Sequence, residues 1–508
     1  MNEPFPSFDD EPPARRAHTA YRLGDLDEAE DGYRAAVAAN PTDAASWSNL
    51  ALVLRARARP HDAEQAARVA LILDPDLSDA HNSLGMAQHD LTRLAEAENS
   101  FGGAIRLRPG NAAAWVNLGV VRQSRGALDE AEVCYREALR LGAGFGQVGG
   151  NLGMVLLEQG RPEEAEAACR AGLEEREGAA TRMNLAMALL QMGRMEEGWA
   201  AYEARLDLDP LPGADDIPLW DGVQPVAGRT LLLRAEQGLG DTLQFCRYAP
   251  MLAAMGAEVV LEVQAPLVRL LHSLSGVARV VVQSDAPPPA DLQCRLMSLP
   301  HHLGTTLETI PGETPYLRPD PAEVAEWGQR LSTLTGRLRV GLVWGGAARP
   351  EQPHAQAGDA RRSMPLAAMA PLAQVAGCDF VSLQVGQKAA EAADPPASLV
   401  LHNVTADLRD FADTAALVAN LDLVIAVDTS VAHLAGAIGK PVWLLNRHAP
   451  CWRWLQDRMD SPWYPVLRQF RQTEPGDWTG VMLRVRAALE QEVQRTCNPA
   501  CLSPMIAG

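Results

Sequence analysis

Apolar residues follow two different patterns along this chain of 508 residues. Up to about residue 206 they recur at the spacing of amphipathic helices. From residue 227 onward they form short β-branched runs, such as residues 259–263 and 423–427, which alternate with helical stretches. Runs of this kind are typical of strands that are buried on both faces of a parallel sheet. The pattern therefore predicts an all-helical part followed by an α/β part.

The helical part repeats itself at intervals of 34 residues. Four kinds of residue keep this interval: Ala29, Ala63, Ala97, Ala131 and Ala165; the glutamates that follow them, Glu30, Glu64, Glu98, Glu132 and Glu166; Leu50, Leu84, Leu118 and Leu152, with Leu185 one residue early; and Pro41, Pro75 and Pro109. The period resembles that of the tetratricopeptide repeat. In such repeats a small alanine lets two helices lie close together, and larger residues fill the space between units.

The sixth repeat unit is atypical, because Gly198-Trp199 stands where the other units have alanine and glutamate. This change suits a terminal unit that packs against something other than another repeat. By resemblance, the groove of such an array binds an extended peptide. Asn117, Asn151 and Asn184 recur in the first helices of their units, and the resemblance implies that they hold a protein acceptor. The alternative is a spacer or a dimer surface, which leaves a homo-oligomer open.

Proline, glycine and aspartate cluster between residues 207 and 226, where the helical period stops. We expect six segments: a disordered tail over 1–14, a repeat array over 15–206, a linker over 207–226, two α/β domains over 227–330 and 331–493, and a flexible tail over 494–508. Alternating strands and helices predict two Rossmann-like, doubly wound parallel sheets. Ligands of such sheets bind at the carboxyl ends of the strands.

The predicted strand over residues 230–234 runs into a turn that contains Gly238, Gly240 and Asp241. A strand, a glycine-rich turn and a helix in succession bring a backbone close to a ligand. The turn lacks the spacing of the dinucleotide-binding fingerprint. Asp241 is either a functional group at the end of a strand or the N-cap of the next helix, and the spacing alone favours the N-cap.

Asp428, Thr429 and Ser430 follow the predicted strand over residues 423–427 and open a helix of small residues. The free N–H groups, the two hydroxyls and the helix dipole at such a corner favour an anion. Taken alone, the pattern is equally that of an ordinary N-cap in an α/β core. His433 lies in the first turn of this helix and either faces a ligand or is a core histidine bonded to backbone.

Six segments follow the repeats in a fixed order: GLGDTLQF, VGLVWGG, RRSMPL, FVSLQVG, VDTSVAHLAGAIGKPVWLL and RWLQDRMDSPWYP. Together they resemble bacterial glycosyltransferases of the GT-B architecture, above all the heptosyltransferase-like group. The repeats in front give the plan of O-linked N-acetylglucosamine transferases. The resemblance covers residues 15–490. It implies an inverting, metal-independent transfer from a nucleotide-sugar to a protein acceptor, with flagellin preferred and no further cofactor.

The resemblance also assigns roles to single residues. Asp241 would be the general base that takes the proton of the acceptor. Arg362 or Lys440 would supply positive charge to the leaving phosphate, and Gln384 would face the nucleotide base. The residues expected to bind the nucleotide-sugar are Gly238, Gly240, Arg362, Gln384, Asp428, Thr429, Ser430 and His433.

The loop after Trp344 departs from the pattern of the family. Related chains have a compact Asn-Pro-x-His followed by Asp and Arg-Ser, whereas residues 345–350 here read GGAARP and an added stretch follows. His354, Asp359, Arg362 and Ser363 still align with the motif. The altered loop supports an alternative function, an inactive scaffold that binds other proteins. A third possible function is a transferase that acts on a saccharide or on a lipid-linked acceptor.

Charge and composition narrow the choice of partners. The net charge of −19 argues against nucleic acid, and with no basic amphipathic helix it also counts against docking to a membrane. No apolar run approaches the roughly 20 residues that span a bilayer. The start of the chain lacks a hydrophobic signal core. The eight cysteines are scattered, which predicts reduced thiols and a cytoplasmic protein.

Overall fold

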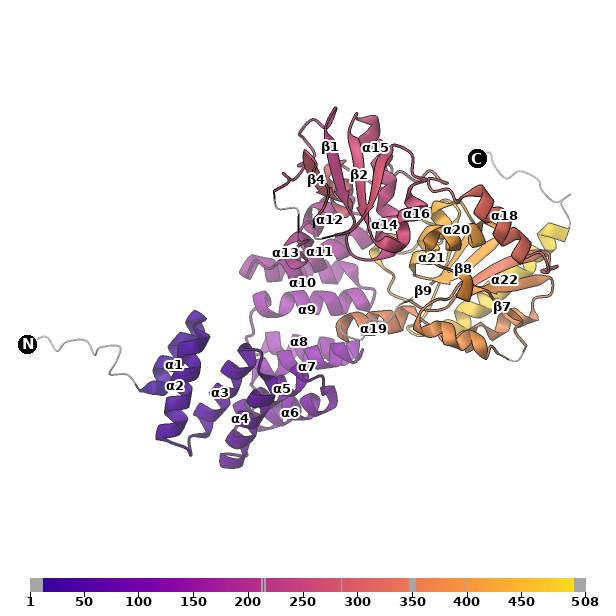
Figure 1. Cartoon of the computed structure of the whole chain (residues 1–508). Coiled ribbons are helices and arrows are strands. Elements are labelled where there is room, and N and C mark those ends of the chain that lie inside the picture. Colours follow the sequence, from indigo (N-terminus) through magenta and orange to yellow (C-terminus); the bar gives the residue numbers. More distant parts are fainter. Residues whose placement is uncertain are drawn as a thin grey trace, which may run out of the picture. The chain divides into compact units, whose positions relative to one another are not determined.

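The computed structural model describes residues 12–211, 213, 216–284, 286–346, 353–396 and 398–497 (Figure 1). The chain divides into two compact units, one up to Thr181 and one from Arg182 onward. Most of the predicted tails, 1–14 and 494–508, lies outside the described residues. Where the structure does describe them, it differs from the prediction, because α1 begins at Pro13 and α22 continues to Cys497.

The first unit is a succession of paired helices, which Figure 1 shows from α1 onward. Its helices are α1 (Pro13–Leu23), α2 (Leu26–Ala39), α3 (Ala44–Ala56), α4 (Pro60–Leu73), α5 (Ser78–Asp90), α6 (Leu94–Leu107), α7 (Ala112–Ser124), α8 (Leu128–Arg140), α9 (Phe145–Glu158) and α10 (Pro162–Glu175). The repeated alanines at 29, 63, 97, 131 and 165 are all fully buried. The repeated leucines are buried as well, so the predicted helical solenoid is confirmed.

The repeated glutamates connect neighbouring units. Glu30 in α2 accepts a hydrogen bond of 2.9 Å from Arg59, the N-cap residue of α4. Glu132 in α8 accepts one of 2.7 Å from Arg161, which begins α10 in the same way. Burial raises the pKa of Glu30, but the hydrogen bonds from its arginines outweigh burial and hold the pKa below its ordinary value. The 34-residue interval of the glutamates therefore reflects an ion-pair ladder along the array.

A second ladder explains the repeated prolines. The indole N–H groups of Trp47 and Trp115 donate to the carbonyls of Pro41 and Pro109, both at 3.0 Å. In the unit between them, His81 Nε2 lies 3.0 Å from the carbonyl of Pro75. Each bond connects the first helix of a repeat to the turn before it. A tryptophan and a histidine therefore make the same contact in successive repeats.

The turn between the two helices of a unit requires a left-handed residue. Gly126 and Gly160 take this conformation, with φ of 80° and 78°. At the equivalent positions of earlier units stand Ala58 and Thr92, with φ of 57° and 60°. A left-handed residue with a Cβ costs roughly 1–2 kcal/mol, and a β-branched residue such as threonine is strained most.

We expect Thr92→Gly to stabilise the array by roughly 1 kcal/mol, because relief of the strain exceeds the greater flexibility of glycine in the unfolded chain. The measurement is the urea midpoint of helix loss in the full chain, followed by circular dichroism. Gly126→Ala is the matched control and should lower that midpoint. A Thr92→Gly chain that unfolds at less urea than the parent would contradict the explanation.

The second unit contains the rest of the last repeat. It comprises α11 (Ala179–Gln191) from Arg182 on, α12 (Met195–Tyr202) and α13 (Arg205–Leu208). The Trp199 ring meets Trp452 edge-on with centroids 5.3 Å apart, and Phe245 at 6.1 Å. The last repeat therefore packs against the α/β part, as its Gly198-Trp199 sequence predicted. The linker is anchored too, since the Trp220 N–H donates to the Gln293 carbonyl at 2.8 Å.

The first sheet is entirely parallel, with strand order β3-β2-β1-β4. Its strands are β1 (Thr230–Arg234), β2 (Glu258–Val263), β3 (Val277–Val282) and β4 (Leu292–Arg295). The helices between them are short: α14 (Leu239–Phe245), α15 (Ala249–Ala254), α16 (Val268–Leu271) and α17 (Leu299–His302). α18 (Pro321–Arg330) leads to the second sheet.

The second sheet is also parallel, with strand order β10-β9-β8-β5-β6-β7. Its strands are β5 (Leu338–Val343), β6 (Cys378–Ser382), β7 (Leu401–Asn403), β8 (Leu423–Val427), β9 (Val442–Asn446) and β10 (Leu467–Arg471), and its helices are α19 (Pro353–Arg362), α20 (Phe411–Ala419), α21 (Ser430–Ala437) and α22 (Trp478–Cys497). Val424 and Ala426 face one buried cluster and Ile425 the other. Both faces are therefore covered, as the β-branched runs predicted.

Among the helices of the described residues, none combines the length and the apolar character needed to cross a membrane.

Candidate functional site

Two strand ends, one from each sheet, meet at a single point. β1 ends at a turn that opens α14, and β8 ends at a turn that opens α21. A Cβ placed on Gly240 would lie 3.0 Å from His433 Cδ2 and 3.5 Å from Ser430 Cα. A side chain at residue 240 would therefore be tight against His433, which would have to move by a few tenths of an ångström. The two corners that the sequence singled out are in direct contact, and we call them together the strand-end corner (residues 238–241 and 428–433).

Asp241 lies in the first turn of α14, where the N-cap residue is Gly238 and not Asp241 as the spacing favoured. Its Oδ2 accepts the N–H of Gly238, the N-cap residue of α14, at 2.9 Å. The carboxylate thus caps the helix from the first turn, although it is not itself the N-cap residue. Its other oxygen, Oδ1, forms an ion pair with Arg453. The carboxylate therefore belongs to the helix and also makes a contact with a loop from the second sheet.

Arg453 is the residue that sequence reasoning missed. It lies in the 3₁₀ turn Trp452–Trp454, and its side chain is 11% exposed. Its Nε donates to Gln244 Oε1 at 3.0 Å, and its guanidinium lies 4.1 Å from the centroid of the Trp452 ring. The only signal for it was its place between Trp452 and Trp454, where it is the first residue of the segment RWLQDRMDSPWYP.

His433 is a buried part of the corner. Its Nδ1 lies 3.0 Å from the Tyr464 hydroxyl, and its ring stacks on Trp454 with centroids 5.1 Å apart. Burial lowers the pKa of His433 to about 4, so the ring is neutral at pH 7. The core interpretation of this histidine holds, with Tyr464 in the place of the expected backbone partner. The ring also forms the surface against which Gly240 lies.

Thr429 and Ser430 open α21 as the sequence predicted. Thr429 is the N-cap residue, and its side chain makes no capping hydrogen bond. Its Oγ1 is buried and, within the described parts of the chain, has no hydrogen-bond partner. A buried hydroxyl without a partner is unfavourable, by roughly 1–3 kcal/mol. An orphaned hydroxyl beside the N-terminus of a helix is suited to a ligand that supplies an acceptor, such as a phosphate oxygen.

Arg362 brings a positive charge to the same edge of the sheet. Its Nη1 donates to the carbonyl of Asp428 at 3.1 Å, and its Nη2 pairs with Asp359 at 2.6 Å. Ser363 Oγ accepts the N–H of Gly346 at 3.1 Å. Arg362 thus reaches the corner despite the altered loop, while Asp359 pairs with Arg362 and Ser363 contacts the turn after β5. Residues 347–352 and the side chain of His354 lie outside what the structure describes.

Lys440 does not lie at this edge. It follows the C-terminal end of α21, and its Nζ donates to the carbonyl of Leu421 at 2.7 Å, before β8 begins. The lysine is therefore at the amino end of the strands, on the edge opposite Thr429. Of the two cations that the resemblance offered, only Arg362 is placed to act on a ligand at the strand-end corner.

Gln384 uses its whole amide on the backbone. Its Oε1 accepts the N–H groups of Trp344 and Gly345 at 3.0 and 2.9 Å, and its Nε2 donates to the carbonyls of Gly345 and Val385 at 3.0 and 2.9 Å. A side-chain amide has two donors and two acceptor positions. None is left for a nucleotide base, so Gln384 shapes the turn after β5 in place of the predicted ligand contact.

The predicted groove asparagines are half-buried, and one of them has a neighbour of its own kind. Asn117 Nδ2 donates to Asn82 Oδ1, in the preceding unit, at 2.9 Å. Asn151 lies in α9, in the compact unit that ends at Thr181. Asn184 lies in α11, in the compact unit that begins at Arg182. Asn82, which stands 35 residues before Asn117, was not among the predicted residues.

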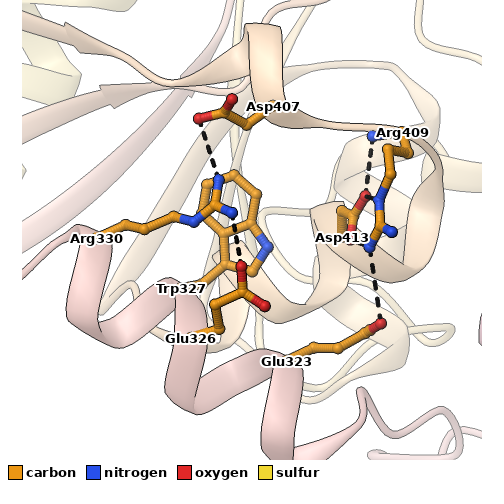
Figure 2. Close-up of a pocket in the computed structure, with 7 residues that line it drawn as sticks. All are labelled: Glu323, Glu326, Trp327, Arg330, Asp407, Arg409 and Asp413. Carbon is orange, nitrogen blue, oxygen red and sulfur yellow. Dashed lines mark hydrogen bonds and ion pairs between the residues drawn. The ribbon is translucent and has the colours of Figure 1, made fainter.

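A separate cavity of about 270 Å³ lies between α18 and the start of α20 (Figure 2). Its charged side chains neutralise one another. Arg330 pairs with Glu326 at 2.6 Å and Asp407 at 3.1 Å, and Arg409 pairs with Asp413 at 2.8 Å. Figure 2 shows two contacts that cross from α18 to the opposite side, Arg330 to Asp407 and Glu323 to Arg409. We interpret it as an ion-pair joint between two helices and not as a ligand site.

This joint gives a pH-dependent prediction. Hydrogen bonds from Arg409, and then from Arg269, hold the pKa of the buried Asp413 carboxyl well below its ordinary value. A carboxyl with a lowered folded-state pKa stabilises the fold above its unfolded pKa of roughly 3.9, and this contribution disappears as pH falls further. We expect Asp413→Asn to cost about 2 kcal/mol at pH 7 and progressively less below pH 4.

The matched control is Asp407→Asn in the same cavity. Asp407 and its partner Arg330 are 60% and 40% exposed, so the substitution should cost less than about 1 kcal/mol. Thermal unfolding of both variants between pH 3 and pH 7 makes the comparison. Equal losses for the two variants, or a deficit of Asp413→Asn that grows in acid, would overturn this account of the joint.

The described part of the chain shows no set of side chains that could bind a metal ion. No group of three or more histidine, cysteine, aspartate or glutamate side chains is arranged there to hold a metal ion.

Comparison with known proteins identifies the helical part. The tetratricopeptide repeat family matches residues 15–78, 82–144 and 151–211. Protein FlbA of Caulobacter vibrioides is 30% identical over 317 residues, which are 57% of this chain and 51% of FlbA. The chain thus spans about half the length of this curated relative. The N-terminal part of the protein is a tetratricopeptide repeat array, followed by a region of two parallel sheets.

Solved repeat proteins are similar to part of the chain. TTC0263, a thermophilic tetratricopeptide repeat protein of Thermus thermophilus, is 25% identical over 35% of this chain and 97% of its own, with a TM-score of 0.33. The first such domain of Spaghetti (RPAP3), bound to an HSP90 peptide, is 24% identical over 22% and 90%, with a TM-score of 0.22. Scores of this size do not bear on function.

Proposed function

We propose that this protein is a glycosyltransferase of the GT-B architecture that moves a sugar from a nucleotide-sugar to a protein acceptor. The observation that carries the proposal is the contact of Gly240 with Ser430 and His433. It joins the ends of two strands from different parallel sheets, and the carboxyl ends of strands are where α/β sheets bind their ligands. Each corner also carries a local sequence pattern of its own, glycines with an aspartate in one and two hydroxyls in the other.

The leaving group would be bound on the side of the second sheet. Breaking the bond between sugar and phosphate leaves growing negative charge on the nucleotide, and preorganised donors at that place lower the barrier. Three groups lie together at this edge: the N-terminus of α21, the Arg362 guanidinium and the Thr429 hydroxyl, which has no partner among the described residues. All three favour an anion, so they support a site for the diphosphate of the donor.

Asp241 would act as the general base on the side of the first sheet. The acceptor hydroxyl loses its proton to the carboxylate while its oxygen forms a bond to the sugar carbon, and the bond from that carbon to the phosphate oxygen breaks. Both oxygens of Asp241 already accept one donor. Each carboxylate oxygen has two acceptor positions, so one remains on each oxygen and can take the acceptor proton. Because His433 is neutral at pH 7, its ring adds no positive charge beside Asp241.

The repeat array would bind the protein acceptor. Tetratricopeptide repeats present a long surface to extended peptides, and the amides of Asn117, Asn151 and Asn184 suit the backbone of such a peptide. The −19 net charge of the chain favours an acceptor segment that is not itself strongly acidic. Flagellin is the first acceptor that we propose to test.

The test is a transfer assay with the full chain. The purified protein is incubated with flagellin and, in turn, with uridine, guanosine and cytidine sugar nucleotides. The mass of the flagellin is then measured by mass spectrometry. The proposal predicts a gain of one or more sugar masses with one class of donor. A chain that neither modifies an acceptor nor hydrolyses any donor would contradict it.

A second candidate is a catalytically inactive scaffold that binds other proteins through its repeats. It is favoured by the direct contact between Gly240 and His433 and by the ion pair that occupies Asp241, because both fill the corner with protein atoms. This candidate predicts binding of a protein partner with no turnover of any nucleotide-sugar. The same assay therefore separates the two functions.

A further inference from the structure

Arg453 holds two side chains of α14 at once. It pairs with Asp241 and donates to Gln244, which lies three residues further along the same helix. Residues at this spacing share one face of a helix. The guanidinium is fixed from a third side by the Trp452 ring at 4.1 Å. The arginine thus has one orientation, and it crosses from the second sheet to the first.

The loop that carries Arg453 is strained and firmly held. Leu455 and Asp457 have φ of 54° and 57°, which is unfavourable for residues with a side chain. Gln469 Nε2 donates to the carbonyls of Trp454 and Asp460, both at 2.8 Å, and Arg471 Nη2 donates to that of Leu455 at 2.6 Å. Strain of this kind persists only where the surroundings enforce it, and it concentrates at functional sites.

The last repeat helices support the same loop. Gln191 Nε2 donates to the carbonyl of Pro450 at 3.3 Å, and the Gln191 carbonyl accepts the N–H of Gln456 at 3.3 Å. The edge-on contact between Trp199 and Trp452 lies between these two bonds along the loop. The loop is therefore held from β10 on one side and from α11 and α12 on the other.

Stability alone does not account for this arrangement. Replacing a buried ion pair by well-packed apolar residues is often neutral or stabilising, so such a pair is weak support for a purely structural role. We infer that Arg453 is a positioning residue for Asp241: together with the Gly238 N–H it fixes both carboxylate oxygens, so that one of the two remaining acceptor positions points at the hydroxyl of the incoming acceptor. The inference rests on the proposed function and concerns the same site.

The test is chemical rescue of Arg453→Ala. A missing guanidinium leaves a space that free guanidinium can fill, whereas urea has nearly the same shape without the charge. We expect kcat to fall about 100-fold with KM for the donor changed less than about threefold, since the loss is one of orientation. Low concentrations of guanidinium chloride should restore kcat at least about tenfold, and equal urea should not.

Two further variants complete the test. Arg453→Lys keeps the charge and should retain more activity than Arg453→Ala. Arg458→Ala changes another arginine of the same loop, one that pairs with the exposed Asp460, and should leave transfer unchanged.

The outcomes are distinct. If the parent chain transfers sugar and Arg453→Ala does so equally well, the inference fails and the proposed function stands. If Arg453→Ala is inactive and neither lysine nor guanidinium restores it, the residue is structural and the inference also fails. A parent chain without any transfer or hydrolysis removes the proposed function, and the role of Arg453 with it.

Discussion

Asp241→Asn is expected to lower sugar transfer by roughly 10²- to 10⁴-fold, the range over which a positioned general base contributes. Asparagine has nearly the same shape and can still accept the N–H of Gly238, so α14 keeps its cap. It cannot take a proton at neutral pH. Binding of the donor should stay within about threefold of the parent, because the proposed phosphate site lies on the second sheet. Steady-state kinetics and calorimetric titration measure the two quantities separately.

The matched control is Asp320→Asn. Asp320 is also a capping carboxylate, and its Oδ1 accepts the N–H groups of Ala322 and Glu323 at the start of α18. If the effect of Asp241→Asn came from helix capping alone, the two substitutions would behave alike. Transfer by Asp241→Asn at the rate of the parent chain would reduce Asp241 to a capping residue.

Thr429→Val is expected to change stability and binding in opposite directions. The Thr429 hydroxyl is buried without a partner in the described residues, so an isosteric methyl group removes an unfavourable burial. The free protein should gain about 1 kcal/mol. The nucleotide should bind roughly tenfold more weakly, because a hydrogen bond to a charged oxygen is lost. Thermal unfolding without ligand and titration with nucleotide-sugar test both signs.

Thr414→Val is the control for Thr429→Val. Thr414 is buried in α20, and its Oγ1 donates to the Asp410 carbonyl at 3.1 Å. Here the hydroxyl has a partner, so valine should destabilise the protein and leave nucleotide binding unchanged. A loss of stability in Thr429→Val, or an unaltered affinity, would return the turn at residue 429 to an ordinary N-cap.

The repeat array could be predicted in detail because its environment recurs. Ala29 and Ala63 occupy the same place in successive units, so one periodic signal reports the same close helix contact many times. The structure adds what a period alone does not show. The glutamates are partners of arginines in the next unit, and His81 does the work of a tryptophan. Both facts depend on contacts that the period does not specify.

The strand-end corner was predictable where its chemistry is local. Glycines and an aspartate after one strand, and hydroxyls after another, mark their turns without reference to the rest of the fold. The assignments that failed depended on three-dimensional placement. Lys440 is near Ser430 in sequence, but α21 rises about 12 Å between its ends and carries the lysine to the opposite edge.

Gln384 and Arg453 show two different reasons why a site residue cannot be predicted from the sequence alone. The position of Gln384 after a strand was predicted correctly. Its amide, however, forms its hydrogen bonds with backbone groups, among them those of the turn after β5. Arg453 reaches Asp241 from 212 residues away, and no local pattern announces such a contact. Pairings between sheets are set by how the sheets pack, which the period of apolar residues does not encode.

The central claim is that residues from both sheets bind one nucleotide-sugar at the strand-end corner. Hydrogen–deuterium exchange of the full chain, with and without a saturating donor from the transfer assay, tests it most directly. The account predicts slower exchange in residues 238–245 and 428–437 together, and it predicts that Thr429→Val needs roughly tenfold more donor to reach the same protection of both segments. Slower exchange confined to other segments, or to one of these two alone, would contradict it.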